Sequence, residues 1–364
     1  MTGPTVSSLV NELHRAYPAG FALNLAFGRF RIQLLSNHDG LIRELKEYFG
    51  PFVSLKPDFE PVMVVTAHQG EPPLTDLAFE TRPPDPGKTK IKEEFVDLPD
   101  GRIVRKRLTG MVFAFGGDLH AAVGPCLDNP NQVVNFINNR HIDWMLNQGG
   151  ILGHAAGVAA HGRGLALAGF SGAGKSTLAL HLMSRGTSFV SNDRLVVQAG
   201  EPMTMHGVAK LPRINPGTIM GNPDLAGMLT ETERGIYEAM VPDELWSLEA
   251  KHDAFLDQCF GPGRFCLEAP MDGLAILNWK RGQGKCRVEV VDLDARRDLL
   301  PAFMKSPGLF FLPRPGINRE PGPEVYVRAL AGSLVLEFSG GVDFILAADT
   351  CLNFLRHGRP GVAA

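Results

Sequence analysis

Cysteine is scarce in this chain, and what little there is lies scattered. The five cysteines are Cys126, Cys259, Cys266, Cys286 and Cys351. The two nearest in sequence, Cys259 and Cys266, have no matching second pair, which argues against a structural zinc site. The count is odd, and the first twenty residues lack a basic cap followed by an apolar run; they indicate a short amphipathic helix instead. We therefore expect reduced thiols and a cytoplasmic protein.

Long apolar runs and a strong net charge are missing too. No stretch reaches the ~18 consecutive apolar residues of a membrane-spanning helix, so we expect no membrane partner. The formal net charge is only −3, which predicts no attraction to nucleic acid. With 364 residues, 44% of them apolar in type, the chain is long enough for two domains that each bury a core.

The first part of the chain has the pattern of a small α+β domain. Alternation over residues 21–37 predicts two strands that turn at Gly28. Residues 70–90 are rich in proline and poor in apolar residues, which favours an exposed loop and makes them the best candidate for disorder. The other expected elements are a helix at 38–50, a buried strand at 62–67, a hairpin around Pro99-Asp100-Gly101, and strands within 110–124.

From Asn129 the hydrophobic period becomes helical, and this helix stops at Gly149-Gly150. We place the domain boundary just before it, giving domains 1–127 and 128–364, and expect the first domain to select an acceptor or mediate assembly. The second domain reads as an α/β core with antiparallel additions. Its expected strands are 162–169, 187–193, 274–279, 286–293, 326–332 and 333–340, and its expected helices are 177–186, 243–258 and 348–358.

Residues 169–177, GFSGAGKST, match the P-loop (Walker A) pattern between an apolar strand and an amphipathic helix. Glycines let successive N–H groups face phosphate oxygens, and the helix adds the positive end of its dipole. Lys175 would contact the β/γ-phosphates and Ser176 would bind Mg²⁺. The alternative is an ordinary glycine turn. The predicted nucleotide-binding residues are Gly169, Ser171, Gly172, Ala173, Gly174, Lys175, Ser176 and Thr177.

A P-loop also needs a carboxylate near the metal. Asp292 ends the segment RVEVVD, but its alternating, polar context favours a half-exposed strand. Asp193 follows the strand directly after the P-loop helix and is the better candidate for a ligand of Mg²⁺. Its alternative is a solvated acid at the end of a strand.

The segment from Gly153 to Asp193 resembles the catalytic core of the HPr kinase/phosphorylase family, with its HPr-kinase-related "kinase B" branch as the best match. The resemblance rests on His154 upstream of the loop, Arg185-Gly186 at the helix end and Asn192-Asp193 at the family's acidic pair. It covers only this segment, and it implies a P-loop core of the phosphoenolpyruvate-carboxykinase type with a mixed sheet, preceded by the α+β domain. By the same resemblance Asp193 would hold or orient Mg²⁺ with His154 near it; taken alone, a histidine between Gly and Ala is more often structural. The resemblance leaves a homo-oligomer open.

The first acid of the family's pair, its base toward the acceptor hydroxyl, is Asn192 here. An amide does not accept a proton at neutral pH, and general-base catalysis contributes typically ~10²–10⁴ in rate. Phosphoryl transfer depends mainly on positioning and charge, so loss of a base slows the reaction without forbidding it. Either Asp193 takes over, or the substrate is activated differently, or turnover is weak.

Two loops carry candidate substrate residues. Residues 210–218, KLPRINPGT, place Lys210 and Arg213 where related kinases have a basic loop that faces the transferred phosphate. A solvated basic loop is the alternative. Residues 260–265, FGPGRF, present Arg264 on a second glycine-rich loop, which would suit a phosphate contact or a plain turn equally.

The sequence thus favours an ATP- and Mg²⁺-dependent kinase that transfers the γ-phosphoryl group to a hydroxyl of a protein serine or a small molecule. The competing hypothesis is a nucleotide-gated regulatory or binding protein with little or no transfer, and Asn192 favours it. A motor or a switch GTPase is a distant third, because no guanine-reading NKxD motif follows the loop.

Overall fold

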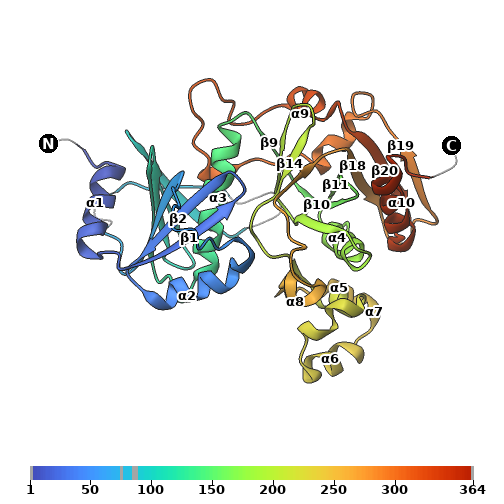
Figure 1. Cartoon of the computed structure of the whole chain (residues 1–364), viewed down its shortest axis with the longest axis horizontal. Helices are drawn as coiled ribbons and strands as arrows, with labels where there is room; N and C mark the ends of the chain where they lie inside the picture. Colours follow the sequence, from blue (N-terminus) through green and yellow to red (C-terminus); the bar gives the residue numbers. More distant parts are fainter. Residues whose placement is uncertain (1–2, 74–76, 84–88, 362–364) are drawn as a thin grey trace. The chain divides into compact units, whose positions relative to one another are not determined.

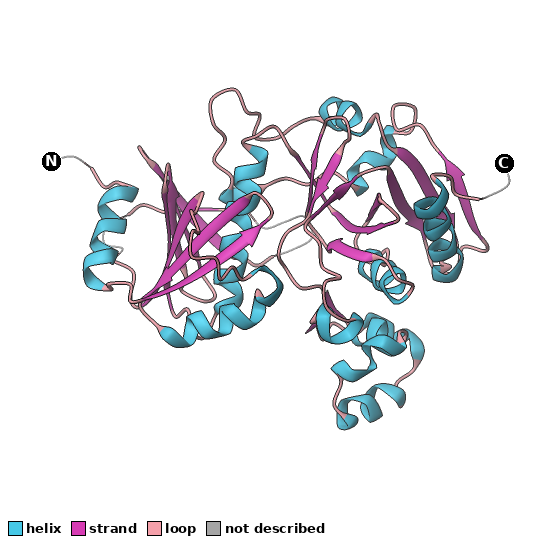
Figure 2. Cartoon of the chain, in the orientation of Figure 1, coloured by secondary structure: helices cyan, strands magenta, loops and turns pink. Residues whose placement is uncertain are grey.

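The structure, a computed structural model, describes residues 3–73, 77–83 and 89–361. The chain forms two compact units, Met1–Trp144 with Pro307–Arg319, and Met145–Ser306 with Glu320–Ala364 (Figure 1). Both units mix helices and strands (Figure 2), so the expected mixed α/β architecture is confirmed. Unit boundaries differ from the expected division at 127/128. The helix that begins at Pro130 belongs to unit 1 as far as Trp144, and the later segment Pro307–Arg319 belongs to unit 1 as well.

Unit 1 is built around one mixed sheet of eight strands, in the order β1-β2-β3-β8-β7-β6-β5-β4. The β2–β3 and β3–β8 pairs are parallel and the other pairs are antiparallel. Its elements are α1 (Val6–Ala16), β1 (Phe21–Phe27), β2 (Phe30–Ser36), α2 (Asp39–Tyr48), η1 (Gly50–Phe52), β3 (Met63–Gln69), β4 (Glu80–Thr81), β5 (Glu93–Leu98), β6 (Gly101–Lys106), β7 (Val112–Gly116), β8 (Leu119–Gly124), α3 (Pro130–Leu146) and η4 (Gly308–Phe310).

Successive side chains of β7 point to opposite faces of this sheet, and a helix covers each face. Val112 and Ala114 pack with the apolar side of α1, including Leu9 and Leu13. Phe113 points to the other face and lies 4.9 Å, ring to ring, from Phe136 of α3. The aromatic residues of α3 therefore hold this helix in unit 1, which is why the boundary falls only in its last turn, between Trp144 and Met145.

Unit 2 contains a mixed six-stranded sheet, β12-β10-β11-β18-β20-β19, and a four-stranded antiparallel sheet, β17-β14-β13-β9. The pairs β11–β18 and β18–β20 are parallel. Its elements are β9 (Ile151–Gly153), β10 (Ala155–Ala160), β11 (Arg163–Gly169), α4 (Lys175–Ser184), β12 (Ser188–Ser191), β13 (Leu195–Gln198), β14 (Thr204–His206), β15 (Arg213–Ile214), α5 (Pro216–Met220), η2 (Pro223–Met228), α6 (Glu231–Glu238), α7 (Pro242–Ser247), β16 (His252–Asp253), α8 (Leu256–Phe260), β17 (Glu268–Pro270), β18 (Gly273–Trp279), β19 (Cys286–Val290), η3 (Arg297–Ala302), α9 (Pro323–Leu330), β20 (Leu334–Gly340) and α10 (Phe344–His357).

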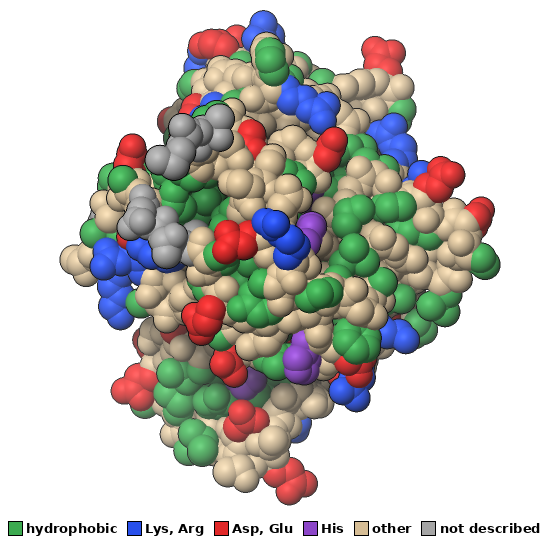
Figure 3. All heavy atoms as spheres, turned by 90° about the vertical axis from the view of Figure 1, so that its left-hand side faces the viewer, with side chains coloured by type: hydrophobic (Ala, Val, Ile, Leu, Met, Phe, Trp, Pro, Cys, Tyr) green, Lys and Arg blue, Asp and Glu red, His purple; other side chains and the backbone are tan. Residues whose placement is uncertain are grey.

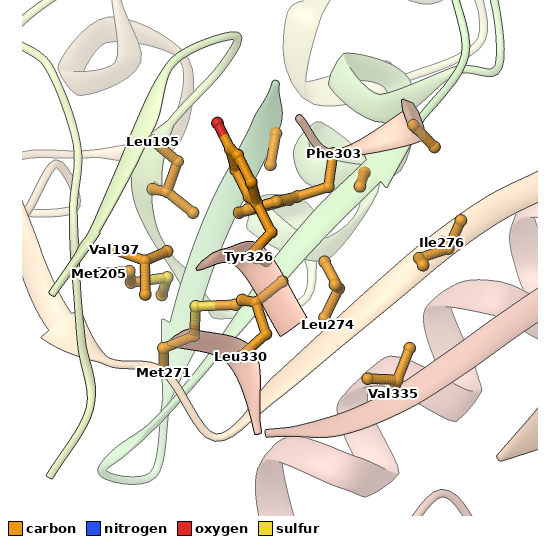
Figure 4. Packing of buried hydrophobic residues seen from close by; sticks show 14 of the residues in the cluster. Leu195, Val197, Met205, Met271, Leu274, Ile276, Phe303, Tyr326, Leu330 and Val335 are labelled. Atoms are coloured by element: carbon orange, nitrogen blue, oxygen red, sulfur yellow. The ribbon is translucent and has the colours of Figure 1, made fainter. Parts of the chain in front are cut away.

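One apolar cluster joins the two sheets of unit 2 (Figure 4). Leu274 and Ile276 of β18 supply one side, and Leu195 and Val197 of β13 supply the other. Tyr326 of α9 closes the cluster, and its hydroxyl donates to the Leu152 carbonyl at 2.8 Å. This packing holds β11 and β12, the strands that precede and follow the glycine-rich loop and its helix.

Three expected elements of the chain differ from the structure. Residues 326–332 were expected as a strand, but residues 326–330 belong to α9 and the last two form the turn after it, because Tyr326 and Leu330, four residues apart, bury one helical face. Residues 243–258 do not form one helix: α7 ends at Ser247, and His252–Asp253 pair with β15 instead. Of the expected loop at 70–90, residues 74–76 and 84–88 lie outside the described residues, and β4 occupies Glu80–Thr81.

Surface properties of unit 1 are mixed. Several large apolar side chains are exposed there, among them Leu55 and Leu108. The face in Figure 3 carries hydrophobic and charged side chains interspersed. Within the described residues, no helix has both the length and the hydropathy needed to cross a membrane.

Candidate functional site

The glycine-rich loop joins the end of β11 at Gly169 to the start of α4 at Lys175. Gly172 and Gly174 have φ of 79° and 90°, a region that side-chain-bearing residues rarely adopt. The Trp279 indole N–H donates to the Ala173 carbonyl at 2.8 Å and fixes the turn. Gly169 and Ala173 do not line a cavity, so their part is to shape the loop. The other predicted residues of the loop and of the start of α4 form the wall of a cavity.

This cavity, of about 480 Å³, collects most of the residues that the sequence singled out. Those that line it are His154, Ser171, Gly172, Gly174, Lys175, Ser176, Thr177, Asn192, Asp193, Lys210 and Arg213. They come from the loop, from the ends of β9 and β12, and from the segment before β15. Residues far apart in the sequence are thus brought to one place.

Lys175 lies under the loop. Its ammonium donates to the Gly169 carbonyl at 2.8 Å, and only 9% of the residue is exposed. Burial lowers the pKa of Lys175 to about 8, with the charge of Lys305 acting in the same direction and Asp193 opposing it. An anion bound at the loop would reverse this shift, because it would compensate the buried positive charge.

Asp193 has a basic partner on each of its two oxygens. Oδ1 lies 3.0 Å from Nε2 of His154, and Oδ2 lies 3.4 Å from Nζ of Lys305. Burial alone would raise the pKa of Asp193, but the hydrogen bond from His154 and the charges of Lys305, His154 and Arg194 outweigh it, so the pKa lies well below its ordinary value. Asp193 therefore stays ionised, which suits an electrostatic role and makes it a poor proton acceptor.

The backbone of His154 is held in place by the segment around Phe303. It lies between β9 and β10, and its backbone N–H donates to the Phe303 carbonyl at 2.6 Å. A bridge between Gly153 and Met304 runs beside this bond. The segment that carries Lys305 is thereby placed next to His154, although the two lie far apart in sequence.

Asn192 differs from its neighbours in its hydrogen bonding. Its Oδ1 is buried and has no hydrogen-bond partner among the described residues. Asn215, which lines the same cavity, has a buried Oδ1 in the same condition. A buried acceptor without a donor costs about 1–3 kcal/mol, so a bound molecule that supplies hydroxyl or N–H groups would be favoured here.

The charge of the cavity is mostly positive. Lys210 has a pKa lowered to about 8, first by burial and then by the charge of Arg194, with Asp193 opposing. Nε of Arg213 lies 3.3 Å from Oδ1 of Asp253 across the β15–β16 pair. Lys251 also lines the wall. Such a set of cations suits a ligand that carries several negative charges.

Arg264 lies elsewhere, which corrects its expected place at the substrate. Its guanidinium donates to the carbonyls of Met183, at 2.8 Å, and Thr187. These carbonyls lie at the C-terminal end of α4, where a cation satisfies unpaired acceptors. Asp292 is exposed, but β19 ends at Val290, so the strand expected over 286–293 stops before this residue.

Several residues of the cavity were not predicted from the sequence. Arg194 follows Asp193 directly, and its position in the Asn-Asp-Arg run was the available signal. Thr218 bonds Thr177 side chain to side chain at 2.9 Å and joins α5 to α4. Trp246 and Lys251 lie in the stretch misread as one helix. Lys305, which has no local motif, does not line the cavity but pairs with Asp193 of its wall.

The residues fit a nucleotide with Mg²⁺. Ser176 and Asp193 both line the cavity and supply the oxygen ligands that Mg²⁺ prefers. The described residues contain no group of three or more His, Cys, Asp or Glu side chains that could hold a metal. Mg²⁺ is commonly held by one or two carboxylates with water and phosphate oxygens, so this small donor set suffices.

Comparison with known proteins adds little detail. No protein-family model matches the chain, and no curated protein matches it either. Among solved structures, the chain is similar to the HPr(Ser) kinase/phosphatase from Coxiella burnetii. The identity is 12%, the match covers 56% of this chain and 94% of that one, and the TM-score is 0.27. This likeness is distant, and the chemistry of the site has to be derived from its own residues.

Proposed function

We propose that unit 2 is an ATP-dependent phosphotransferase that requires Mg²⁺ and transfers the γ-phosphoryl group to a hydroxyl acceptor. One observation carries the proposal: the glycine-rich loop with its buried Lys175 and the Asp193–His154 pair line a single cavity. A phosphate cradle and a potential proton acceptor oriented by a carboxylate are the two parts that phosphoryl transfer to a hydroxyl uses.

The loop and α4 would bind the phosphates. Backbone N–H groups around Gly172 and Gly174, the N-terminal end of α4 and the Lys175 ammonium all favour negative charge. Mg²⁺, held by Ser176 and Asp193, would supply positive charge beside the phosphate oxygens. The γ-phosphoryl group would then lie on the side of the cavity where Lys210 and Arg213 can stabilise charge in the transition state.

The acceptor hydroxyl would be handled by His154 and Asn192 together. Asp193 bonds Nε2 of His154, which leaves the other ring nitrogen to take the hydroxyl proton, in the manner of a base oriented by a carboxylate. The unpartnered Oδ1 of Asn192 would accept a hydrogen bond from the same hydroxyl and orient it without removing its proton. Because the transition state is loose, this positioning supports transfer even with a weak base.

A nucleotide-gated binding protein is the second candidate. Asn192 favours it, since an amide is no proton acceptor, and Lys305 and His154 already engage both oxygens of Asp193. In that case ATP would bind and change the contacts of the chain without efficient transfer. The class of acceptor, a protein serine or a small molecule, is read from the labelled species in the experiment that follows.

The full chain, incubated with Mg²⁺, γ-labelled ATP and cell extract, tests the proposal. We expect the unaltered chain to label a protein or metabolite that the extract alone does not label, and Lys175→Gln, which keeps most of the side-chain volume but loses the charge, to add no such species. ATP binding with no labelled species would overturn the phosphotransferase and leave the binding protein. No ATP binding would overturn both.

Asn192→Asp separates the two roles of that position. If proton removal limits the rate, the new carboxylate should accelerate transfer, by up to the ~10²–10⁴ that general-base catalysis provides. Asn215→Asp is the matched control, because it places a carboxylate at the other unpartnered amide of the cavity. An equal effect of both changes would attribute the gain to charge alone.

A further inference from the structure

A second cavity shares lining residues of α4, α5 and α7 with the first. Thr177, Thr218 and Trp246 line both cavities, and the hydrogen bond between the two threonines lies at their common wall. Figure 1 shows α5 and α7 beside α4. A ligand whose phosphates lie on the glycine-rich loop can therefore continue into this space, which has a volume of about 720 Å³.

The second cavity is lined by several glycines, by three aromatic side chains and by Arg281, whose Nη1 lies 3.6 Å from Oδ1 of Asp243 in the same wall. Cζ of Arg281 lies 4.1 Å from the centre of the Trp246 ring, and the Phe344 ring lies 6.0 Å from that of Trp246. His181 stacks on Phe344 at 5.8 Å and an interplanar angle of 25°. Planar cationic and aromatic groups of this kind are the usual platform for a nucleobase.

This aromatic group is coupled to the loop. A Cβ added at Gly174 would lie 2.5 Å from the Phe344 ring, so Phe344 packs directly on the loop backbone. Trp279 contacts Phe344 edge to face at 5.3 Å and donates to the Ala173 carbonyl. The phosphate cradle and the aromatic wall are thus held at a fixed separation by shared contacts.

We propose that the second cavity binds the nucleobase of the nucleotide, stacked against Trp246 within the group that Arg281 and Phe344 complete. The inference rests on the proposed function, because it takes the first cavity as the site of the phosphates. It deepens that function: affinity comes from the base as well as from the phosphates, so the chain selects a nucleoside triphosphate over a bare polyphosphate.

Trp246→Ala in the full chain tests the inference by calorimetric titration with MgATP and with magnesium tripolyphosphate. Stacking of a base on an aromatic side chain contributes ~1–3 kcal/mol, which corresponds to about 5- to 150-fold in Kd. We expect ATP to bind that much more weakly and tripolyphosphate to bind unchanged. Tyr237→Ala is the matched control, because Tyr237 lies on the nearby helix α6 but lines neither cavity. It should leave the Kd of both ligands unchanged.

Fluorescence gives a second measurement that does not depend on the folding of Trp246→Ala. The chain has three tryptophans, and Trp279 contacts the loop itself, so the emission of Trp246 is taken as the difference between the unaltered chain and Trp246→Phe. ATP should change this difference, and tripolyphosphate should leave it unchanged. Equal effects of Trp246→Ala on both ligands, or no effect on ATP, would overturn the inference alone. If the unaltered chain binds neither ligand, the proposed function fails and the inference fails with it.

Discussion

At the scale of single residues, the main property of the site is positive charge that few carboxylates compensate. Lys175 and Lys210 both have a pKa lowered to about 8, chiefly by burial. A lysine in this state is protonated at neutral pH at a cost, and a bound polyanion removes that cost. The cavity is thus electrostatically complementary to phosphate in the unbound chain.

Binding of ATP should therefore depend on pH on the alkaline side. Below about pH 8 both lysines are protonated and affinity is full; above it each lysine must regain a proton on binding, so Kd rises by up to tenfold per pH unit for each. Lys210→Arg keeps its charge throughout and should make the rise shallower by about one logarithmic unit per pH unit. Titration of MgATP from pH 7 to 9.5 measures this.

Lys280→Arg, an exposed substitution just after β18, is the control and should leave the pH profile unchanged. An identical rise in Kd for the unaltered chain and for Lys210→Arg would show that Lys210 does not face the bound phosphates.

Sequence alone identified the residues whose neighbours in the chain form a motif. Lys175, Asp193 and His154 were found because the loop and its flanks have recognisable spacing, and the structure brings the three into one cavity. Lys305 was not found, since it reaches Asp193 across 112 positions through the pairing of its segment with His154. Their roles in binding and transfer remain predictions.

At the scale of elements, the loop and α4 are held at both ends by contacts outside the motif. Gly174 at the start of α4 combines a φ of 90° with the Phe344 ring where a Cβ would lie. Gly172 has a φ of 79°, but within the described part of the chain no atom lies within 4 Å of its added Cβ. The two glycines therefore differ in packing while sharing a similar backbone conformation.

Gly174→Ala should destabilise the chain more than Gly172→Ala. Both pay about 1–2 kcal/mol for a left-handed residue with a Cβ, and only Gly174→Ala must also displace the Phe344 ring. Urea unfolding without nucleotide measures the difference. Equal losses would mean that Phe344 does not pack on the loop.

The C-terminal end of α4 supplies a second prediction. Arg264→Ala removes guanidinium bonds to the Met183 and Thr187 carbonyls and should lower the free energy of unfolding by about 1–3 kcal/mol. The Kd for MgATP should stay within about twofold, because Arg264 lies away from the cavity. A Kd raised tenfold in a variant of normal stability would restore the substrate role that the sequence suggested.

Elements with one dominant signal were predicted well from sequence. The strands on either side of Gly28 and the hairpin at Asp100-Gly101 are confirmed, because alternation and turn residues agree there. Residues 326–332 were misread, since seven residues with apolar spacing of four can satisfy a strand or a helix until packing on the core selects one. The helix expected over 243–258 is interrupted because His252 and Asp253 pair with β15, and this pairing cannot be read from the local sequence.

At the scale of the whole molecule, unit 1 depends on residues that come late in the sequence. Arg102 donates to the Leu309 carbonyl at 2.8 Å, and Arg140 donates to the Phe310 carbonyl. The Phe310 ring stacks on Phe115 at 5.5 Å and an interplanar angle of 18°. Local patterns could not predict this return of the chain, and for that reason the expected division at 127/128 missed it.

Phe310→Ala should consequently weaken unit 1, although the change lies in the C-terminal quarter of the chain. Removing a buried phenylalanine costs about 3–5 kcal/mol. Hydrogen exchange of the full chain should rise in β7 and α3 and stay unchanged in β11 and α4, because the lost contacts are with Phe113, Phe115 and Phe136. Phe338→Ala is the matched control in unit 2, where Phe338 packs on Trp279, and it should produce the reverse pattern. Faster exchange in both units after either change would mean that the units unfold as one, and the segment 307–319 would then stabilise the loop and its cavity as well as the sheet of unit 1.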